Sequence, residues 1–292
     1  MIVSRFHFHS SSYHIVSSLQ QNFIFSTNRP LIMGIVNVTP DSFSDGGLYL
    51  SARLAIAHAR NLIDEGVDIL DIGGESTRPG SQPVSIDEEL SRVIPVLEAL
   101  VDTNIPISVD TSKPEVMKRV IEAGAFMIND VNALRSPGAL EVIAQNNHVQ
   151  VCLMHMQGTP QDMQKSPQYK NIVTEVKDFL QQRIDAAKAA GISQDRLVID
   201  PGFGFGKTFQ HNLALLNQLN EFTTLGVPVL AGLSRKSMLG IITGNNVSHR
   251  IHESIAAALL AVVKGAKIVR VHDVKASKDA LAVYTAMQNC DV

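Results

Sequence analysis

Short apolar segments alternate with longer amphipathic segments from about residue 30 to the end of the chain. The short segments are rich in β-branched residues and nearly continuous in apolar residues, as in parallel strands that are covered on both faces. We expect eight such strands: LIMGIVN (31–37), DILDIGG (68–74), IPISVD (105–110), AFMIND (125–130), VQVCLMH (149–155), RLVIDPG (196–202), PVLAGLS (228–234) and KIVRVHD (267–273).

Segments of helical periodicity separate the strands. The clearest predicted helices cover residues 51–65, 86–101, 114–123, 171–190, 212–220 and 252–264. Eight strands with intervening helices are typical of a closed (β/α)8 barrel, also called a TIM barrel, and an open doubly wound sheet is the alternative. No linker-like stretch divides the chain, so we expect a single α/β domain from residue 21 to residue 292.

The composition agrees with one large core. The chain has 292 residues, and a single barrel commonly needs about 250. Charged residues make up 18% of the sequence, below the roughly 25% of average globular chains, so much of the chain should be buried.

The first 30 residues differ from the rest because they are rich in serine and histidine and contain no acidic residue. This composition faintly resembles an organelle transit segment, but it lacks the arginine density of such a segment and the apolar centre of a signal peptide. We expect residues 1–20 to form a loosely ordered N-terminal extension, with a cleaved targeting segment as the alternative.

Charge and hydropathy exclude several classes of partner. The formal net charge is −3 and no run of lysine or arginine is present, so we expect neither nucleic acid nor a membrane surface as a partner. No apolar stretch reaches the roughly 18 residues of a membrane-spanning helix. The two cysteines are too few for a disulfide framework, which favours a reducing, cytoplasmic location.

Polar residues end all of the predicted strands. A single acid or amide at such a position is usually a turn former or helix cap. In a barrel, however, all eight strand ends open on the face that carries the active site. Together they predict a binding site, because buried polar groups need partners. The residues are Asn37, Asp71, Asp110, Asn129, His155, Asp200, Ser234 with Arg235 and Lys236, and Arg270 with His272.

The chemistry of these side chains favours a flat heterocycle with amino and ring N–H groups. Asp110 and Asp200 are acceptors, and Asn129 can both donate and accept. Lys236 could polarise a ring carbonyl or nitrogen, and Arg235 could stack on a ring or meet an anion. Arg270 and His272 lie two residues apart on one strand, so they point the same way and could bind a phosphate.

Three loops carry further candidates. DPGFGFGKT, residues 200–208, fits neither the dinucleotide fingerprint nor the phosphate loop in its spacing, and we interpret it as a glycine-rich turn in which Phe203 or Phe205 forms a ring wall. GGESTRPG, residues 73–80, could close over a substrate or be a solvated connection. SRKSMLG, residues 234–240, predicts a helix N-terminus capped by Ser234 and suited to an anion.

Eight successive segments resemble the sequence blocks of the dihydropteroate synthase family, in that family's order and over residues 32 to about 273. They are MGIVNVTPDSFSDGG, DIGGESTRPG, ISVDTSKPEVM, INDVNAL, MHMQGTP, DPGFGFGK, GLSRKSMLG and VRVHD. The resemblance implies a homodimeric barrel enzyme and sulfonamide target that joins 6-hydroxymethyl-7,8-dihydropterin diphosphate to p-aminobenzoate and releases diphosphate.

The resemblance also implies roles for individual residues. The expected pterin ligands are Asp110, Asn129, Asp200 and Lys236. The expected diphosphate ligands are Asn37, Thr77, Arg78, Arg270 and His272. The expected surroundings of p-aminobenzoate are Ser76, Thr77, Pro79, Phe205, Ser234, Arg235 and Lys236. The implied cofactor is Mg²⁺, with Asn37 as a ligand and Asp45 as a further metal partner. The residues implied to act in catalysis are Asn37, Thr77, Arg78, Asp110, Lys236, Arg270 and His272.

Two other functions use part of the same residue set. A pterin-binding methyltransferase barrel would share the Asp and Asn residues, but would have little need for the TPDSFSDGG and ESTRPG loops. A catalytically silent barrel would bind pterin or act as a scaffold, and would normally have lost polar residues at the strand ends.

Overall fold

The computed structural model describes residues 23–38 and 47–290, without the side chains of residues 47–50. The expected extension at residues 1–20 and the candidate metal partner Asp45 therefore lie outside the described residues.

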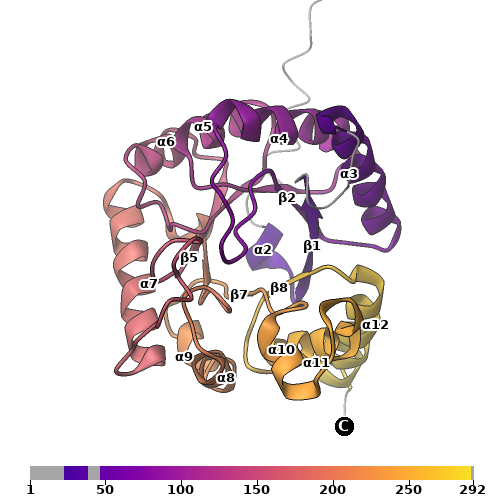
Figure 1. Cartoon of the computed structure of the whole chain (residues 1–292), viewed down its shortest axis with the longest axis vertical. Coiled ribbons are helices and arrows are strands. Elements are labelled where there is room, and N and C mark those ends of the chain that lie inside the picture. Colours follow the sequence, from indigo (N-terminus) through magenta and orange to yellow (C-terminus); the bar gives the residue numbers. More distant parts are fainter. Residues whose placement is uncertain (1–22, 39–46, 291–292) are drawn as a thin grey trace, which may run out of the picture.

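Eight parallel strands form one sheet that closes into a barrel (Figure 1). Their order is β6-β5-β4-β3-β2-β1-β8-β7, and a parallel bridge between Ile199 and Val229 joins the two end strands. This bridge confirms the barrel and excludes the open sheet. The strands are β1 (Leu31–Asn37), β2 (Ile69–Gly73), β3 (Ile107–Asp110), β4 (Met127–Asp130), β5 (Gln150–Met154), β6 (Leu197–Asp200), β7 (Leu230–Ala231) and β8 (Ile268–Val271).

Helices surround the barrel on the outside, and α2 lies at its centre in the view of Figure 1. The predicted helices are present with shifts of a few residues at their ends, and α2, α6, α9 and α12 are additional. The helices are α2 (Phe23–Ser26), α3 (Gly47–Asp64), α4 (Ile86–Leu100), α5 (Pro114–Glu122), α6 (Ala139–Gln145), α7 (Ile172–Ala189), α8 (Phe209–Asn217), α9 (Asn220–Thr223), α10 (Ser237–Thr243), α11 (Ile251–Val263) and α12 (Val274–Gln288), with short 3-10 turns η2 (Val101–Thr103), η3 (Gln194–Arg196) and η4 (Val247–His249).

The alternation of side chains along each strand separates two apolar layers. One set packs with the helices in the large outer core, for example Leu70, Ile128 and Val269. The other set fills the barrel interior together with Ile24 of α2, and comprises Leu31, Met33, Ile69, Phe126, Met127, Cys152, Val198, Leu230 and Ile268. Polar side chains at the strand ends therefore rest on an apolar interior layer.

Strand β7 is much shorter than the predicted 228–234. Pro228 has no N–H to donate, and its carbonyl oxygen accepts a hydrogen bond from the Ile199 N–H at 3.0 Å. Arg235 then takes a left-handed backbone conformation with φ of 59°. The chain consequently leaves the sheet early, and residues 234–236 form a turn above the barrel.

Among the described residues, no helix combines the length and the apolar character that crossing a membrane requires.

Candidate active site

Arg270 is the centre of a buried polar network at the carboxyl ends of the strands, which we call the mouth of the barrel. Its Nε donates to Asp71 Oδ2 at 2.6 Å and its Nη2 donates to Asp110 Oδ2 at 3.1 Å. Asn129 Nδ2 donates to the same Asp71 oxygen at 3.1 Å. Strands β2, β3, β4 and β8 thus contribute one residue each to a single cluster.

Two glycines place further polar residues next to this network. A Cβ built on Gly73 would lie 3.7 Å from Asp110 Cβ and 3.8 Å from Asn37 Oδ1. A Cβ built on Gly232 would lie 3.9 Å from Arg270 Cβ and 4.0 Å from Asp200 Oδ2. Asn37 and Asp200 therefore lie close to the Arg270 network, on β1 and β6.

Lys236 approaches the site from the turn after β7. Its Nζ lies 4.3 Å from the centre of the Phe205 ring, a cation–π distance. A Cβ built on Gly204 would lie 3.5 Å from Lys236 Nζ, so the glycine leaves room for the lysine beside the ring. Phe205 is half-buried and can form a wall, whereas Phe203 is buried in the outer core; of the two phenylalanines suggested for that wall, Phe203 was therefore wrong.

Burial changes the protonation of the site. It raises the pKa of Asp110 to about 7, against the lowering effect of Arg270. It also raises the pKa of Asp200. It lowers the pKa of Lys236 to about 8, and the Arg270 charge acts in the same direction. Groups whose pKa values are shifted toward neutrality in one pocket are typical of a functional site.

Ser234 was expected to cap the helix that follows it, and this prediction was wrong. Helix α10 begins at Ser237, and the residue before it, Lys236, makes no side-chain cap. Ser234 instead bonds to His272: its Oγ lies 2.9 Å from the ring Nδ1 and accepts the His272 N–H at 3.2 Å. Burial lowers the pKa of His272 to about 3, so the ring is neutral at pH 7.

Arg235 is less available than the sequence suggested. Its guanidinium donates to both carboxylate oxygens of Asp273, at 3.2 and 2.7 Å. The backbone N–H of Arg235 donates to Ser254 Oγ at 2.9 Å. Its charge is therefore partly neutralised at the rim of the site.

The loop that carries Ser76, Thr77, Arg78 and Pro79 lies beside the mouth rather than inside the network. Ser76 and Thr77 are half-buried, and Arg78 and Pro79 are exposed. No hydrogen bond or ion pair joins the Arg78 side chain to another described residue. The loop reaches toward the segment after β5, where the Gly80 N–H donates to the Pro160 carbonyl at 2.9 Å.

The base of this loop is held by an ionic cluster that the sequence analysis missed. Lys113 Nζ lies 2.9 Å from Glu75 Oε2 and 2.5 Å from Glu89 Oε2. Glu89 is fully buried. Arg92 donates to the Gly74 carbonyl at 2.8 Å, so α4 fixes both Gly74 and Glu75. One half of GGESTRPG is thus anchored, and the other half, from Arg78 to Gly80, is exposed.

His155 and Lys207 form a second structural pair. Lys207 Nζ lies 2.9 Å from His155 Nδ1 and donates to the carbonyl of Phe205 at 2.9 Å. Burial lowers the pKa of Lys207 to about 7 and the pKa of His155 to about 2. The pair ties the glycine-rich turn after β6 to the end of β5, and so His155, although it ends a strand, points to this pair rather than to the Arg270 network.

The donor set suits Mg²⁺ only in part. The Asn37 amide oxygen lies beside Gly73, and carbonyl oxygens are ligands that Mg²⁺ accepts. No group of three His, Cys, Asp or Glu side chains in the described residues could hold a metal ion by itself. The residues therefore fit an ion that is held mainly by water and by a phosphate-bearing substrate.

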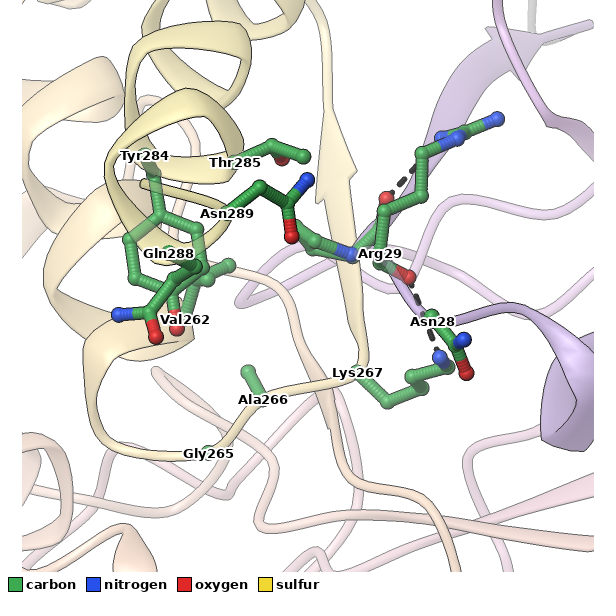
Figure 2. Close-up of a pocket in the computed structure, with 11 residues that line it drawn as sticks. Asn28, Arg29, Val262, Gly265, Ala266, Lys267, Tyr284, Thr285, Gln288 and Asn289 are labelled. Carbon is green, nitrogen blue, oxygen red and sulfur yellow. Dashed lines mark hydrogen bonds between the residues drawn. The ribbon is translucent and has the colours of Figure 1, made fainter. Parts of the chain in front are cut away.

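A cavity of about 550 Å³ lies away from this network, between the ends of α11 and α12 and the segment before β1 (Figure 2). Its lining includes Arg29, Lys267 and Asn289. Lys267 donates to the carbonyl of Arg29 at 3.1 Å, and Arg29 pairs with Asp68. Both cations are occupied by the chain itself, and no candidate site residue lines the cavity.

The mouth of the barrel has the character of a heterocycle site. Carboxylates and an amide oxygen offer acceptors, and a lysine and an arginine offer donors over an apolar interior layer. This combination is typical of barrel enzymes that bind an N–H-rich ring at the strand ends.

Comparison with known proteins identifies the family. The family described as pterin binding enzyme matches residues 33–272. The dihydropteroate synthase of Neisseria meningitidis serogroup C is 51% identical over 269 residues, which cover 91% of this chain and 95% of that protein.

Two solved structures of Xanthomonas albilineans dihydropteroate synthase are also similar. The structure with 4-aminobenzoic acid is 55% identical with a TM-score of 0.86, and the complex with 7,8-dihydropteroate is 49% identical with a TM-score of 0.81; each match covers 90% of this chain and 95% of that chain. The chain belongs to the pterin-binding enzyme family, in its dihydropteroate synthase branch.

Proposed function

We propose that the chain condenses 6-hydroxymethyl-7,8-dihydropterin diphosphate with p-aminobenzoate to give 7,8-dihydropteroate and diphosphate. The observation that carries this proposal is the convergence of Asp110, Asn129, Asp200 and Arg270 from four strands at the mouth of the barrel. The relatives solved with 4-aminobenzoic acid and with 7,8-dihydropteroate support the choice of ligands.

The pterin ring would lie against the acceptors. Asp200 Oδ1 already accepts the Gly202 N–H at 2.7 Å, so Oδ2, beside Gly232, faces the ligand. Asp110 and the Asn129 amide oxygen complete an acceptor edge for the amino and ring N–H groups. Lys236 would donate to the acceptor side of the ring, close to the Phe205 wall.

The diphosphate would lie between Asn37, Arg270 and His272, beneath Thr77 and Arg78 of the exposed loop. Arg270 keeps Nη1 free of hydrogen bonds to described residues, so it can donate to an anion while Asp71 and Asp110 hold its other nitrogens. Since His272 is neutral, it offers an N–H donor rather than a charge. Arg78 supplies an unpaired cation from above.

The second substrate would enter between Ser76, Thr77, Pro79 and Phe205 on one side and Ser234, Arg235 and Lys236 on the other. Thr77 and Phe205 are half-buried and Pro79 is exposed, so an aromatic amine can reach this region from solvent. A sulfonamide with the same outline should compete for it.

The reaction requires no protein nucleophile. The amine nitrogen of p-aminobenzoate forms a bond to the exocyclic methylene carbon, the bond from that carbon to the diphosphate oxygen breaks, and the amine loses a proton. The acidic pterin pocket stabilises the electron-poor ring, and Arg270 and Arg78 stabilise the departing anion. Bound Mg²⁺, for which we propose Asn37 and Asp45 as protein partners, would neutralise further diphosphate charge.

The direct test mixes purified protein with the pterin diphosphate, p-aminobenzoate and Mg²⁺ and measures dihydropteroate and diphosphate. Equal amounts of both products are expected. Folded protein that yields neither would overturn the proposal, and it would favour the silent barrel. Methyl transfer from a methylated folate without condensation would favour the methyltransferase alternative.

We further propose a homodimer in a reducing, cytoplasmic environment. Helices α11 and α12 lie side by side (Figure 1) and expose Leu260, Val263, Val283 and Met287 by 52% to 72%. Such a patch favours a second copy as partner. Light scattering should give twice the chain mass for the wild type. The double variant Leu260→Lys, Val283→Lys should give the mass of a single chain.

The proposed reducing environment rests on the cysteines, since Cys152 and Cys290 are both free.

A further inference from the structure

Asp71 is a fully buried carboxylate that joins two candidate ligand-binding residues. Its Oδ2 accepts from Arg270 Nε at 2.6 Å and from Asn129 Nδ2 at 3.1 Å. Its exposed fraction is 0%, so a bound substrate would not touch it. Neither the chemistry of the reaction nor the set of expected ligands uses this residue.

The contact with Asn129 fixes the orientation of an amide. A carboxylate can only accept hydrogen bonds, so Asn129 must turn its NH2 group toward Asp71. Its Oδ1 must then point away from Asp71. That oxygen is buried and has no hydrogen-bond partner among the described residues. A buried acceptor without a partner is costly, so the position selects a ligand that brings an N–H donor.

The contact with Arg270 fixes the guanidinium. With Nε on Asp71 and Nη2 on Asp110, the planar group is held at two of its three nitrogens. The plane of the guanidinium, and therefore the direction in which Nη1 points, is set by two carboxylates on neighbouring strands.

We infer that Asp71 is a positioning residue that makes Asn129 a hydrogen-bond acceptor and holds Arg270, and that it thereby selects a heterocycle with an amino group at the edge facing Asn129. The inference rests on the proposed pterin site and specifies how that site distinguishes a pterin from a deaminated analogue. Lumazine is such an analogue, because a carbonyl replaces the 2-amino group of pterin. The carbonyl oxygen of lumazine would face Asn129 Oδ1, and both atoms are hydrogen-bond acceptors.

The experiment measures, by calorimetry, the affinity of the protein for a 6-hydroxymethyl pterin and for the corresponding lumazine. Three variants are compared with the wild type. Asp71→Leu keeps the shape and removes the acceptor. Asp71→Asn keeps one oxygen, which can still accept from both donors, and removes the charge. Ser108→Ala is the matched control, because Ser108 is buried next to Asp71 on β3 and its Oγ has no partner among the described residues.

The wild type should prefer the pterin by at least about tenfold, since a site built to accept a hydrogen bond rejects a ligand that lacks the donor. Asp71→Leu should reduce that preference to about twofold, because the freed amide can rotate and donate to the lumazine carbonyl. Asp71→Asn and Ser108→Ala should both retain the preference.

A folded Asp71→Leu protein that keeps the wild-type preference for pterin would overturn the inference. An Asp71→Asn protein whose preference for pterin falls as far as the value expected for Asp71→Leu would also overturn it. Wild-type protein that binds neither ligand would instead overturn the pterin site itself, which the inference requires. Should Asp71→Leu fail to fold, NMR of the wild type decides. The Asn129 side-chain NH2 signal, assigned by its loss in Asn129→Asp, should exchange slowly with solvent without ligand, and rapid exchange would contradict the inference.

Discussion

Arg270 donates to Asp110 at 3.1 Å although 160 positions separate the two residues in the chain. Strands β8 and β3 are not neighbours in the sheet, because β1 and β2 lie between them. The contact therefore crosses the inside of the barrel. It exists only because the closed ring of strands turns both side chains toward one axis, and it is the clearest sign that distant polar residues serve one site.

The affinity for pterin should fall on both sides of an optimal pH, which gives the pH profile an acidic limb and an alkaline limb. Because burial raises the pKa of Asp110 to about 7, its carboxylate acceptor is lost as pH falls through about 7. Because burial lowers the pKa of Lys236 to about 8, its donor charge is lost as pH rises through about 8. Binding should be tightest between these values, measured by calorimetry from about pH 5 to about pH 10.

Two variants assign the limbs. Asp110→Asn should lack the acidic limb and Lys236→Met should lack the alkaline limb, each with weaker binding at the optimum. A limb that persists in both variants belongs to the ligand, and a flat profile in the wild type would show that these groups do not titrate with binding.

Asn37→Ala should impair turnover more than pterin binding. The side chain lies beside Gly73, where we propose that the diphosphate and the metal bind. We expect kcat to fall by about tenfold or more at saturating Mg²⁺, with the affinity for a pterin lacking diphosphate within about twofold of the wild type. Equal losses in the two measurements would argue against this position for the diphosphate.

Lys113→Met should destabilise the fold. The change leaves Glu89, which is fully buried, without its cation, and removing one partner of a buried ion pair costs about 3–5 kcal/mol. Urea unfolding measures the loss. The exposed Lys118 on the adjacent helix α5 gives the control, because Lys118→Met should change stability by less than about 0.5 kcal/mol.

The double variant Lys113→Met, Glu89→Gln should recover part of that stability, since it removes the uncompensated charge. If Lys113→Met were no worse than Lys118→Met, the cluster would not anchor the base of the loop.

Gly202→Ala should be far more harmful than Gly191→Ala, although both glycines have positive φ, of 71° and 89°. A Cβ on Gly202 would overlap the His155 carbonyl oxygen, whereas nothing lies within 4 Å of one on Gly191. We expect a loss of about 1–2 kcal/mol at Gly191 and of about 3 kcal/mol or more at Gly202. Thermal unfolding gives the comparison, and similar losses would show that the turn after β6 can shift.

Periodicity was sufficient to predict the barrel, because each strand is an apolar run and each strand end is polar. It placed Asp110, Asn129 and Asp200 on the correct strand ends for a common site. It failed where backbone geometry decides. The left-handed Arg235 and the early end of β7 moved Ser234 from a helix cap to a partner of His272, and no local pattern in the sequence signals that change.

The sequence also could not predict which polar side chains form hydrogen bonds and ion pairs with one another. The sequence marks Asp71 and His155 equally as polar residues at strand ends. Only the arrangement in space shows that Asp71 supports Arg270 and Asn129, while His155 turns to Lys207. The same holds for Glu75, whose motif suggested a mobile loop but whose carboxylate is fixed by Lys113.

The central claim is that the pterin ring binds between Asp110, Asn129, Asp200 and Arg270. A crystal structure of the protein with bound 7,8-dihydropteroate tests it most directly. The account predicts that the amino and ring N–H groups lie within hydrogen-bonding distance of Asp110, Asn129 Oδ1 and Asp200 Oδ2. A pterin ring bound elsewhere, for example in the cavity lined by Arg29, Lys267 and Asn289, would contradict it.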